Sequence, residues 1–198
     1  AVQKILSENE LKIMNGPPAT VKTTTLVQAI IALIKQGAKK ILVTAPSNTA
    51  VDLLSEKISE QGINVLRIGN PARVTERLLQ LTLDSKISQH SDMKEMKQLK
   101  KQAQEFKNMA HKYKRSFGRE EREQRKLLFD EAHKIMKHVE QAEQYIADDV
   151  IGKAQVVAAT LVGAAHYSVQ QLQYDVAVID EAGQALEPAC FIPALKTQ

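Results

Sequence analysis

The sequence has few of the residues that build disulfide networks, zinc clusters or base-stacking platforms. Cys190 is the only cysteine, which excludes an internal disulfide and a cysteine-rich zinc site and favours a reducing compartment. Tryptophan is absent and aromatic residues make up only 4% of the 198 residues. This scarcity argues against extensive stacking of nucleic-acid bases on exposed rings.

Long apolar segments are absent as well. No run approaches the ~20 residues that cross a bilayer, and the opening AVQKILSENE lacks the pattern of a signal peptide. We therefore expect no membrane association and a cytoplasmic location, or a nuclear one in a eukaryote. The length allows one domain with an insertion.

Positive charge is concentrated in one segment. The net charge is +4, but residues 93–126 alone carry 12 Lys and Arg against 5 Glu, so the remainder is slightly acidic. Such a block is typical of a solvated helix face, and a nucleic-acid-binding surface is the alternative.

Strands and helices alternate at both ends of the chain. Apolar runs ending at Gly or Pro predict strands, and amphipathic segments ending at Gly predict helices. The predicted strands are 10–16, 39–46, 63–69, 153–163 and 174–184, and the predicted helices are 22–37 and 47–62, the second with Ser47 or Asn48 as its N-cap. This alternation predicts an α/β fold with a parallel sheet covered on both faces.

No strand is predicted between about residues 71 and 149. Apolar residues recur there at spacings of three and four in two series, separated by a break at Gly118: Met96, Leu99, Ala103, Phe106, Ala110, Tyr113 and Phe117, then Leu128, Ala132, Ile135, Val139, Ala142 and Ile146. The series predict an antiparallel helical hairpin inserted into the sheet domain. The predicted division is 1–71, 72–149 and 150–198. Residues 188–198 contain no predicted closing element, so we expect the last part to be truncated.

The segment MNGPPATVKTTT, residues 14–25, is similar to a phosphate-binding loop. Gly16 and Lys22-Thr23 have the required spacing, whereas Val21 occupies the position of the second glycine. Lys22 would reach the β- and γ-phosphates, the Thr23 hydroxyl would bind Mg²⁺, and backbone N–H groups would cradle the phosphates. The alternative is an ordinary strand-turn-helix that carries Lys-Thr by chance.

The apolar strand VAVI ends in Asp180-Glu181. In a parallel sheet this places two carboxylates at the carboxyl edge, where ligands of α/β proteins bind. Asp180 would hold the metal through water, and Glu181 would take a proton from the attacking water. Together with the loop, this pair favours a nucleotide-binding site with Mg²⁺.

Two further strand ends carry small polar residues. Residues 44–52, TAPSNTAVD, combine Ser47, Asn48 and Thr49 with the start of a helix, which suits the phosphates of a nucleic-acid backbone but also an ordinary capped helix. Thr160 follows another strand, in AATLVGAA.

In this order, the segments GPPATVKTTT, APSNTAVD, RIGNPARV, VVAATLVGAA and VAVIDEAGQALEPACFIPAL resemble the first motor domain of Upf1-like superfamily 1B helicases. The resemblance covers nearly all of residues 1–72 and 150–198. It implies a RecA-like P-loop NTPase domain, ATP hydrolysis with Mg²⁺, and 5′-to-3′ movement on single-stranded DNA or RNA. The hairpin lies where these helicases carry an inserted subdomain that touches nucleic acid.

The resemblance also assigns roles to individual residues. It implies nucleotide contacts from Gly16, Pro17, Pro18, Ala19, Thr20, Val21, Lys22, Thr23 and Thr24. It implies metal binding by Thr23 and Asp180, catalysis by Glu181 with Lys22, γ-phosphate sensing by Gln184, and nucleic-acid contacts from Pro46, Ser47, Asn48 and Thr160.

The chain departs from the family pattern in two ways. Ala19 and Val21 replace loop glycines, and a Cβ hinders both positive φ and close phosphate approach. We expect ATP binding to be weakened by about a hundredfold or more. The resemblance also implies a downstream Gly-Asp-x-x-Gln segment, a second RecA-like domain with an arginine finger, and an upstream adenine-reading segment, and we expect these to lie wholly or partly outside the 198 residues. We therefore expect weak hydrolysis and no unwinding.

Two other interpretations stay open. One is a catalytically inactive RecA-like module that binds nucleic acid through the basic hairpin and the start of the PSNTA helix. The other is a structural domain whose hairpin is a coiled-coil docking arm. Binding through Lys and Arg should weaken steeply with salt, whereas docking through apolar seams should not.

Overall fold

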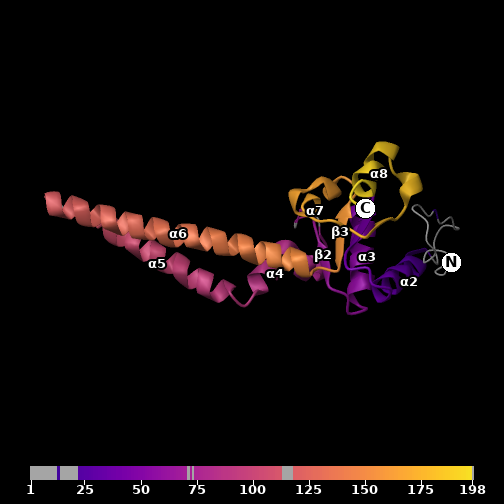
Figure 1. Cartoon of the computed structure of the whole chain (residues 1–198), viewed down its shortest axis with the longest axis horizontal. Coiled ribbons are helices and arrows are strands. Elements are labelled where there is room, and N and C mark those ends of the chain that lie inside the picture. Colours follow the sequence, from indigo (N-terminus) through magenta and orange to yellow (C-terminus); the bar gives the residue numbers. More distant parts are fainter. Residues whose placement is uncertain (1–12, 14–21, 71, 73, 113–117, 198) are drawn as a thin grey trace. The chain divides into compact units, whose positions relative to one another are not determined.

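A computed structural model describes residues 13, 22–70, 72, 74–112 and 118–197 (Figure 1). Most of the predicted strand at 10–16 and of the predicted phosphate-binding loop lies outside this described part. The chain divides into two compact units, which are described separately below. The sheet unit comprises residues 1–85 and 153–198, and the hairpin unit comprises residues 86–152.

The described residues of the sheet unit form four strands: β1 (Ile41–Ala45), β2 (Val65–Arg67), β3 (Val156–Thr160) and β4 (Val176–Ile179). All pairings are parallel, and the strand order is β2-β3-β1-β4. The predicted α/β class with a parallel sheet is confirmed, and the arrangement is consistent with a RecA-like P-loop domain. β3 lies between β2 and β1 although it follows the hairpin in the sequence.

Both helices predicted for the first part of the chain are confirmed. They are α2 (Lys22–Lys35) and α3 (Asn48–Ser59). Gly37 and Gly62, which follow their ends, have φ of +110° and +77°, a conformation that glycine adopts at helix C-termini without a Cβ penalty.

Short helical segments complete the sheet unit: η2 (Glu76–Leu81), η3 (Gly163–Ala165), α7 (Tyr167–Gln170), η4 (Ala182–Gln184) and α8 (Glu187–Ala194). α8 forms where the sequence predicts no closing element. Its Pro188 stands in the first turn, where a missing N–H costs no hydrogen bond.

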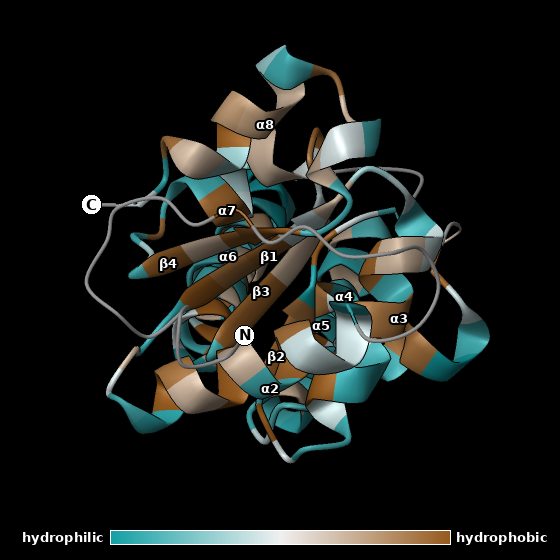
Figure 2. Cartoon of the chain, turned by 90° about the vertical axis from the view of Figure 1, so that its right-hand side faces the viewer, coloured by the Kyte–Doolittle hydropathy of each residue, from teal (hydrophilic) through white to brown (hydrophobic). Residues whose placement is uncertain are grey.

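The core of the sheet unit is a cluster of β-branched and aliphatic side chains. Ile41, Val43 and Ala45 of β1 face Val27 and Ile30 of α2 together with the buried side of α3. Val74, Leu78 and Leu81 belong to the same cluster. The strands are mostly apolar, with Thr44, Arg67 and Thr160 as exceptions, and lie between α2 and α3 on one side and α7 and α8 on the other (Figure 2).

The hairpin unit consists mainly of α5 (Met93–His111) and α6 (Arg119–Lys153), and α4 (Leu83–Gln89) leads into it. The two long helices are antiparallel. Lys100 Nζ lies 2.6 Å from Glu143 Oε1, and further along α5 the ring centroids of His111 and Phe129 are 5.1 Å apart.

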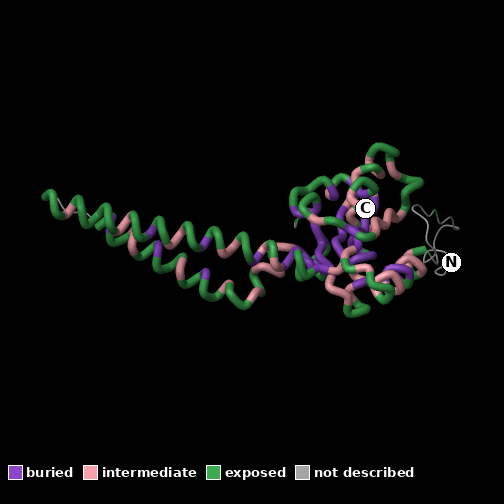
Figure 3. The backbone as a smooth tube through the Cα atoms, in the orientation of Figure 1, coloured by how far each residue is buried: buried purple, intermediate pink, exposed green. Residues whose placement is uncertain are grey.

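Contact between α5 and α6 follows a narrow line, here called the seam. Its buried members recur every seven residues, as the sequence predicts: Met96, Ala103 and Ala110 on α5, and Ala132, Val139 and Ile146 on α6. The rest of both helices is largely exposed (Figure 3). Tyr113 and Phe117 of the predicted series lie outside the described residues. None of the described helices is long and apolar enough to cross a membrane.

Candidate functional site

Three adjacent strands end at the same edge of the sheet. Ala45 of β1 pairs with Thr160 of β3, and Thr44 pairs with Ile179 of β4. The residues that follow these strands therefore lie side by side. The structure brings together the start of the Pro46–Asn48 segment, Thr160 and the Asp180-Glu181 pair.

Hydrogen bonds from the backbone N–H groups of Asp180 and Glu181 hold the acid pair in place. The Asp180 N–H donates to the Thr44 carbonyl at 2.8 Å, and the Glu181 N–H donates to Asp180 Oδ1 at 3.0 Å. Glu181 has φ 52° and ψ 35° and is the only non-glycine residue with positive φ in the described part of the chain. This left-handed conformation costs about 1–2 kcal/mol. Such strain persists where the surrounding structure over-determines it, and it clusters at functional sites.

Gln184 lies one short turn further on. Its N–H donates to the Glu181 carbonyl at 2.8 Å within η4. Glu181 and Gln184 are both exposed, and Asp180 is partly exposed. Carboxylate and amide groups are thus accessible to a ligand at the end of β4.

Only the helical end of the predicted phosphate-binding loop is described. Lys22 is the first residue of α2, Thr23 is half-buried, and Thr24 is exposed. The first turn of α2 contains no acidic residue, which suits the binding of an anion at the positive end of the helix dipole. The other predicted members of the loop lie outside the described residues: Gly16, Pro17, Pro18, Ala19, Thr20 and Val21.

The predicted nucleic-acid contacts sit on a capped helix and a tight turn. Ser47 is the N-cap of α3, and its Oγ accepts from the Ala50 N–H at 3.1 Å. Thr160 Oγ1 accepts from the Gly163 N–H at 3.0 Å. A Cβ on Gly163 would lie 2.8 Å from that hydroxyl, so the turn that holds the Thr160 side chain requires glycine.

Comparison with known proteins identifies the family. A family model described as an AAA domain matches residues 1–198. The chain belongs to this family. Its relatives place it among the Upf1-like superfamily 1 helicases, where it corresponds to the first motor domain.

Three relatives illustrate the match. DNA-binding protein SMUBP-2 of Mesocricetus auratus is 34% identical over 99% of this chain and 20% of its own length. The DNA polymerase alpha-associated DNA helicase A of Schizosaccharomyces pombe is 34% identical over 98% of this chain and 28% of its own length. A homolog of regulator of nonsense transcripts 1 from Arabidopsis thaliana is 33% identical over 98% of this chain and 14% of its own length. The chain thus spans less than a third of each of these relatives.

Sequence reasoning missed one part of this helicase domain, a buried arginine behind the predicted nucleic-acid contacts. The Arg67 side chain is 0% exposed, and its Nε lies 2.9 Å from Asp52 Oδ1. Its Nη2 donates to Asn48 Oδ1 at 2.9 Å and its Nη1 to the Ile68 carbonyl. The available signal was an arginine inside the apolar run INVLRIG, because an arginine at a buried position requires a partner.

The described residues of this helicase domain offer a small set of metal ligands. They contain no group of three or more His, Cys, Asp and Glu side chains that could hold a metal ion. The oxygen donors of Thr23 and Asp180 fit Mg²⁺, which is commonly held by one or two protein groups together with substrate phosphates and water.

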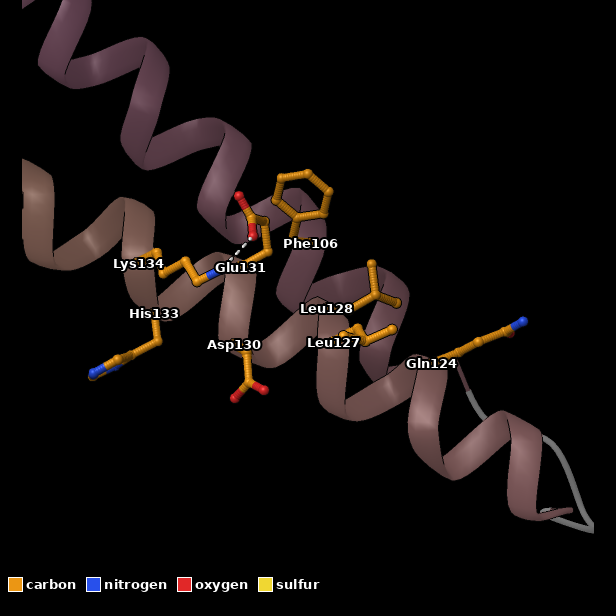
Figure 4. A pocket seen from close by; sticks show the side chains of 8 residues that line it. All are labelled: Phe106, Gln124, Leu127, Leu128, Asp130, Glu131, His133 and Lys134. Carbon is orange, nitrogen blue, oxygen red and sulfur yellow. Dashed lines mark hydrogen bonds and ion pairs between the residues drawn. The ribbon is translucent and has the colours of Figure 1, made fainter.

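A hollow in the hairpin unit contains none of the predicted site residues. It has a volume of about 730 Å³ and is lined by Phe106, Gln124, Leu127, Leu128, Asp130, Glu131, His133 and Lys134. Phe106 comes from α5 and Leu128 from α6, and Lys134 pairs with Glu131 at 3.4 Å (Figure 4). This mixture of apolar and charged groups matches none of the phosphate-binding motifs.

Proposed function

We propose that this chain is the first RecA-like motor domain of an ATP-dependent helicase or translocase that moves 5′-to-3′ on single-stranded DNA or RNA. The carrying observation is the convergence of Asp180, Glu181 and the ends of β1 and β3 at one edge of the sheet, with Glu181 held in a left-handed conformation. The motor would need a second RecA-like domain of the parent chain, and its place of action would be the cytoplasm or the nucleus.

Each predicted site residue has a role in this proposal. Lys22 binds the β- and γ-phosphates, and Thr23 and Asp180 hold Mg²⁺ directly and through water. Bound Mg²⁺ would neutralise charge on the phosphates. Glu181 accepts the proton of the attacking water, and the Gln184 amide faces the γ-phosphate.

Nucleic acid would bind along the neighbouring strand ends. Pro46, Ser47, Asn48 and Thr160 would contact the backbone of the strand, and the basic hairpin would add contacts to phosphates. This placement is supported by the pairing of Ala45 with Thr160, which aligns the ends of β1 and β3.

We also propose that Ala19 and Val21 weaken ATP binding. Backbone N–H groups of a phosphate-binding loop must approach the phosphates closely, and glycine allows both this approach and positive φ. A β-branched residue such as Val21 tolerates neither well. Strain of about 1–3 kcal/mol for each residue corresponds to a loss of about a hundredfold or more for the pair.

Calorimetric titration with Mg·ATP tests both proposals. We expect weak binding by the unmodified chain and binding at least about a hundredfold tighter by the Ala19→Gly, Val21→Gly double variant. Lys22→Ala in the double variant should abolish the gain, whereas Lys35→Ala in the last turn of the same helix should not. Tight binding by the unmodified chain would contradict the weakened loop. Absence of binding by every variant would contradict the ATP site.

The second candidate is a catalytically inactive RecA-like module that binds nucleic acid. The two loop substitutions favour it, because they affect the nucleotide site and leave the α3 contacts unchanged. Retained binding to single-stranded nucleic acid without any binding of ATP by the double variant would support this candidate.

The division into 1–71, 72–149 and 150–198 is part of the proposal. The compact hairpin unit begins at Lys86 and ends at Gly152, and a variant in which a short Gly-Ser linker replaces residues 86–152 offers the test. If the sheet domain is independent, this variant will fold and keep its affinity for Mg·ATP.

A further inference from the structure

We propose that Arg67 is a positioning residue for nucleic-acid binding: it fixes the side-chain amide of Asn48 so that the NH₂ group is presented to a phosphate of the bound strand. This inference rests on the proposed contact between Asn48 and nucleic acid. It adds a residue that does not touch the ligand, because the Arg67 side chain is 0% exposed.

The chemistry of arginine determines how the Asn48 amide is turned. Arginine can only donate hydrogen bonds, so the group that faces Arg67 Nη2 at 2.9 Å must be the Asn48 carbonyl oxygen. The amide nitrogen is thereby directed to the other side. It has no hydrogen bond within the described residues, and Asn48 is partly exposed at the first position of α3. Two N–H donors are thus available to an acceptor such as a phosphate oxygen.

The guanidinium itself has little freedom. Arg67 Nε is bound to Asp52 Oδ1 at 2.9 Å, and Nη1 donates to the Ile68 carbonyl. Asp52 is held in turn, because its Oδ2 accepts from the Thr75 N–H at 3.1 Å. A Cβ on Gly69 would lie 2.7 Å from Arg67 Nη1. Glycine at this position therefore avoids a steric clash with the guanidinium.

The network links three segments that are distant in the sequence: the start of α3, the end of β2 and the chain that precedes η2. Because the Asp52 carboxylate offsets the Arg67 charge, the contribution of Arg67 is directional. An amide that is already oriented loses less rotamer entropy when it binds. Lysine could pair with Asp52, but a single ammonium group lacks the planar fork that reaches Asp52 and Asn48 together.

A double-mutant cycle on the full chain tests the inference. Affinity for fluorescein-labelled oligothymidylate and oligouridylate is measured by anisotropy for the unmodified chain, Arg67→Lys, Asn48→Ala and the double variant. We expect each single variant to bind about two- to tenfold more weakly, the range of one net hydrogen bond. The double variant should bind no more weakly than Asn48→Ala, since Arg67 acts through Asn48. Arg77→Lys, an exposed arginine on η2, is the matched control and should bind normally.

A second measurement does not depend on nucleic acid. In ¹H–¹⁵N NMR spectra, the Asn48 side-chain NH₂ group should be ordered in the unmodified chain and mobile in Arg67→Lys. Gly69→Ala provides a variant that keeps every polar group and should mobilise the same NH₂ group by displacing the guanidinium. This variant decides the matter if thermal unfolding shows that Arg67→Lys is not folded.

The outcomes separate the inference from the proposed function. Additive losses in the cycle, or an Asn48 amide that stays as ordered in Gly69→Ala and Arg67→Lys as in the unmodified chain, would overturn the positioning role while nucleic-acid binding stands. Absence of binding by the unmodified chain to either oligonucleotide would overturn the proposed function and the ligand assigned to Asn48. An ordered amide that becomes mobile in both variants, with non-additive losses, would support the inference.

Discussion

The sheet unit and the hairpin unit bury their residues in contrasting ways. In the sheet unit, strands β1, β2 and β3 are buried apart from Thr160, and a charged pair, Arg67 with Asp52, lies inside. In the hairpin unit, the buried residues are the seam, half of whose members are alanine, and Val150 and Ile151 near the end of α6. The Lys100–Glu143 ion pair keeps 46% and 32% of its side chains exposed.

This contrast indicates different tasks. A site that must hold two carboxylates and an oriented amide requires the fixed geometry of the sheet unit. A surface that contributes mainly positive charge requires only length and exposure, which two helices with a narrow seam provide. Substitutions at buried positions should therefore destabilise the whole sheet unit, whereas in the hairpin unit their effect should stay local.

The two units should differ most in how much their free energy of unfolding falls when one ion pair in each unit is broken. Asp52→Ala leaves Arg67 buried without its counter-charge, and we expect the free energy of unfolding to fall by about 3–5 kcal/mol. Urea unfolding followed by circular dichroism measures it. Glu143→Ala, which breaks the exposed pair, should cost less than about 1 kcal/mol. Similar losses in both variants would contradict the contrast.

A cavity in the seam tests whether the units unfold separately. Ile146→Ala removes a side chain that is 1% exposed, and we expect a local loss of about 2 kcal/mol. Hydrogen exchange should accelerate in α5 and α6 and remain unchanged in β1 and β3. Acceleration in the strands as well would show that the units unfold together.

Charge removal from the hairpin should act on nucleic-acid binding without affecting the sheet. Replacing Lys94, Lys97 and Lys101 by Gln should reduce the dependence of log affinity on log salt by about 0.7 for each phosphate that the hairpin ceases to neutralise. Anisotropy titrations at several salt concentrations measure the slope. An unchanged slope would favour the coiled-coil docking arm, and thermal unfolding serves as the control for folding.

The smallest expected effect concerns a buried tyrosine of the sheet unit. Burial raises the pKa of Tyr174, whose hydroxyl donates to the Val169 carbonyl at 3.3 Å. Because the folded state favours the neutral phenol, its contribution is complete below the unfolded pKa of about 10 and is lost as the pH rises above it. Tyr174→Phe should cost about 1 kcal/mol at neutral pH and reduce this alkaline loss, whereas Tyr145→Phe, exposed on the hairpin, should change neither.

Periodic patterns made much of the fold predictable. The seven-residue recurrence of Met96, Ala103 and Ala110 identified the seam, because a long helix buries the same face at every second turn. Alternating strands and helices identified a parallel sheet, and the Ser47 cap was readable because its hydroxyl acts within one helical turn.

Features that depend on residues distant in the sequence could not be predicted from local sequence patterns. The strand order β2-β3-β1-β4 has no local signal. The positive φ of Glu181 is opposed by its local preference and is held by tertiary structure. Arg67 looked like one polar residue in an apolar run, since its partners Asn48 and Asp52 lie 19 and 15 residues earlier. Short segments such as η2 and α7 are too brief to produce a periodic pattern.

The strand order also constrains how the chain folds during synthesis. β1 and β2 are made first, yet in the described sheet both pair with β3, and β1 pairs with β4. Both of these partners are translated after the hairpin. A nascent chain that has reached the end of α6 therefore has helices to fold but lacks the central strand that joins β1 to β2. On the ribosome, the hairpin can form before Val156–Thr160 emerges from the exit tunnel, whereas the sheet can assemble only afterwards.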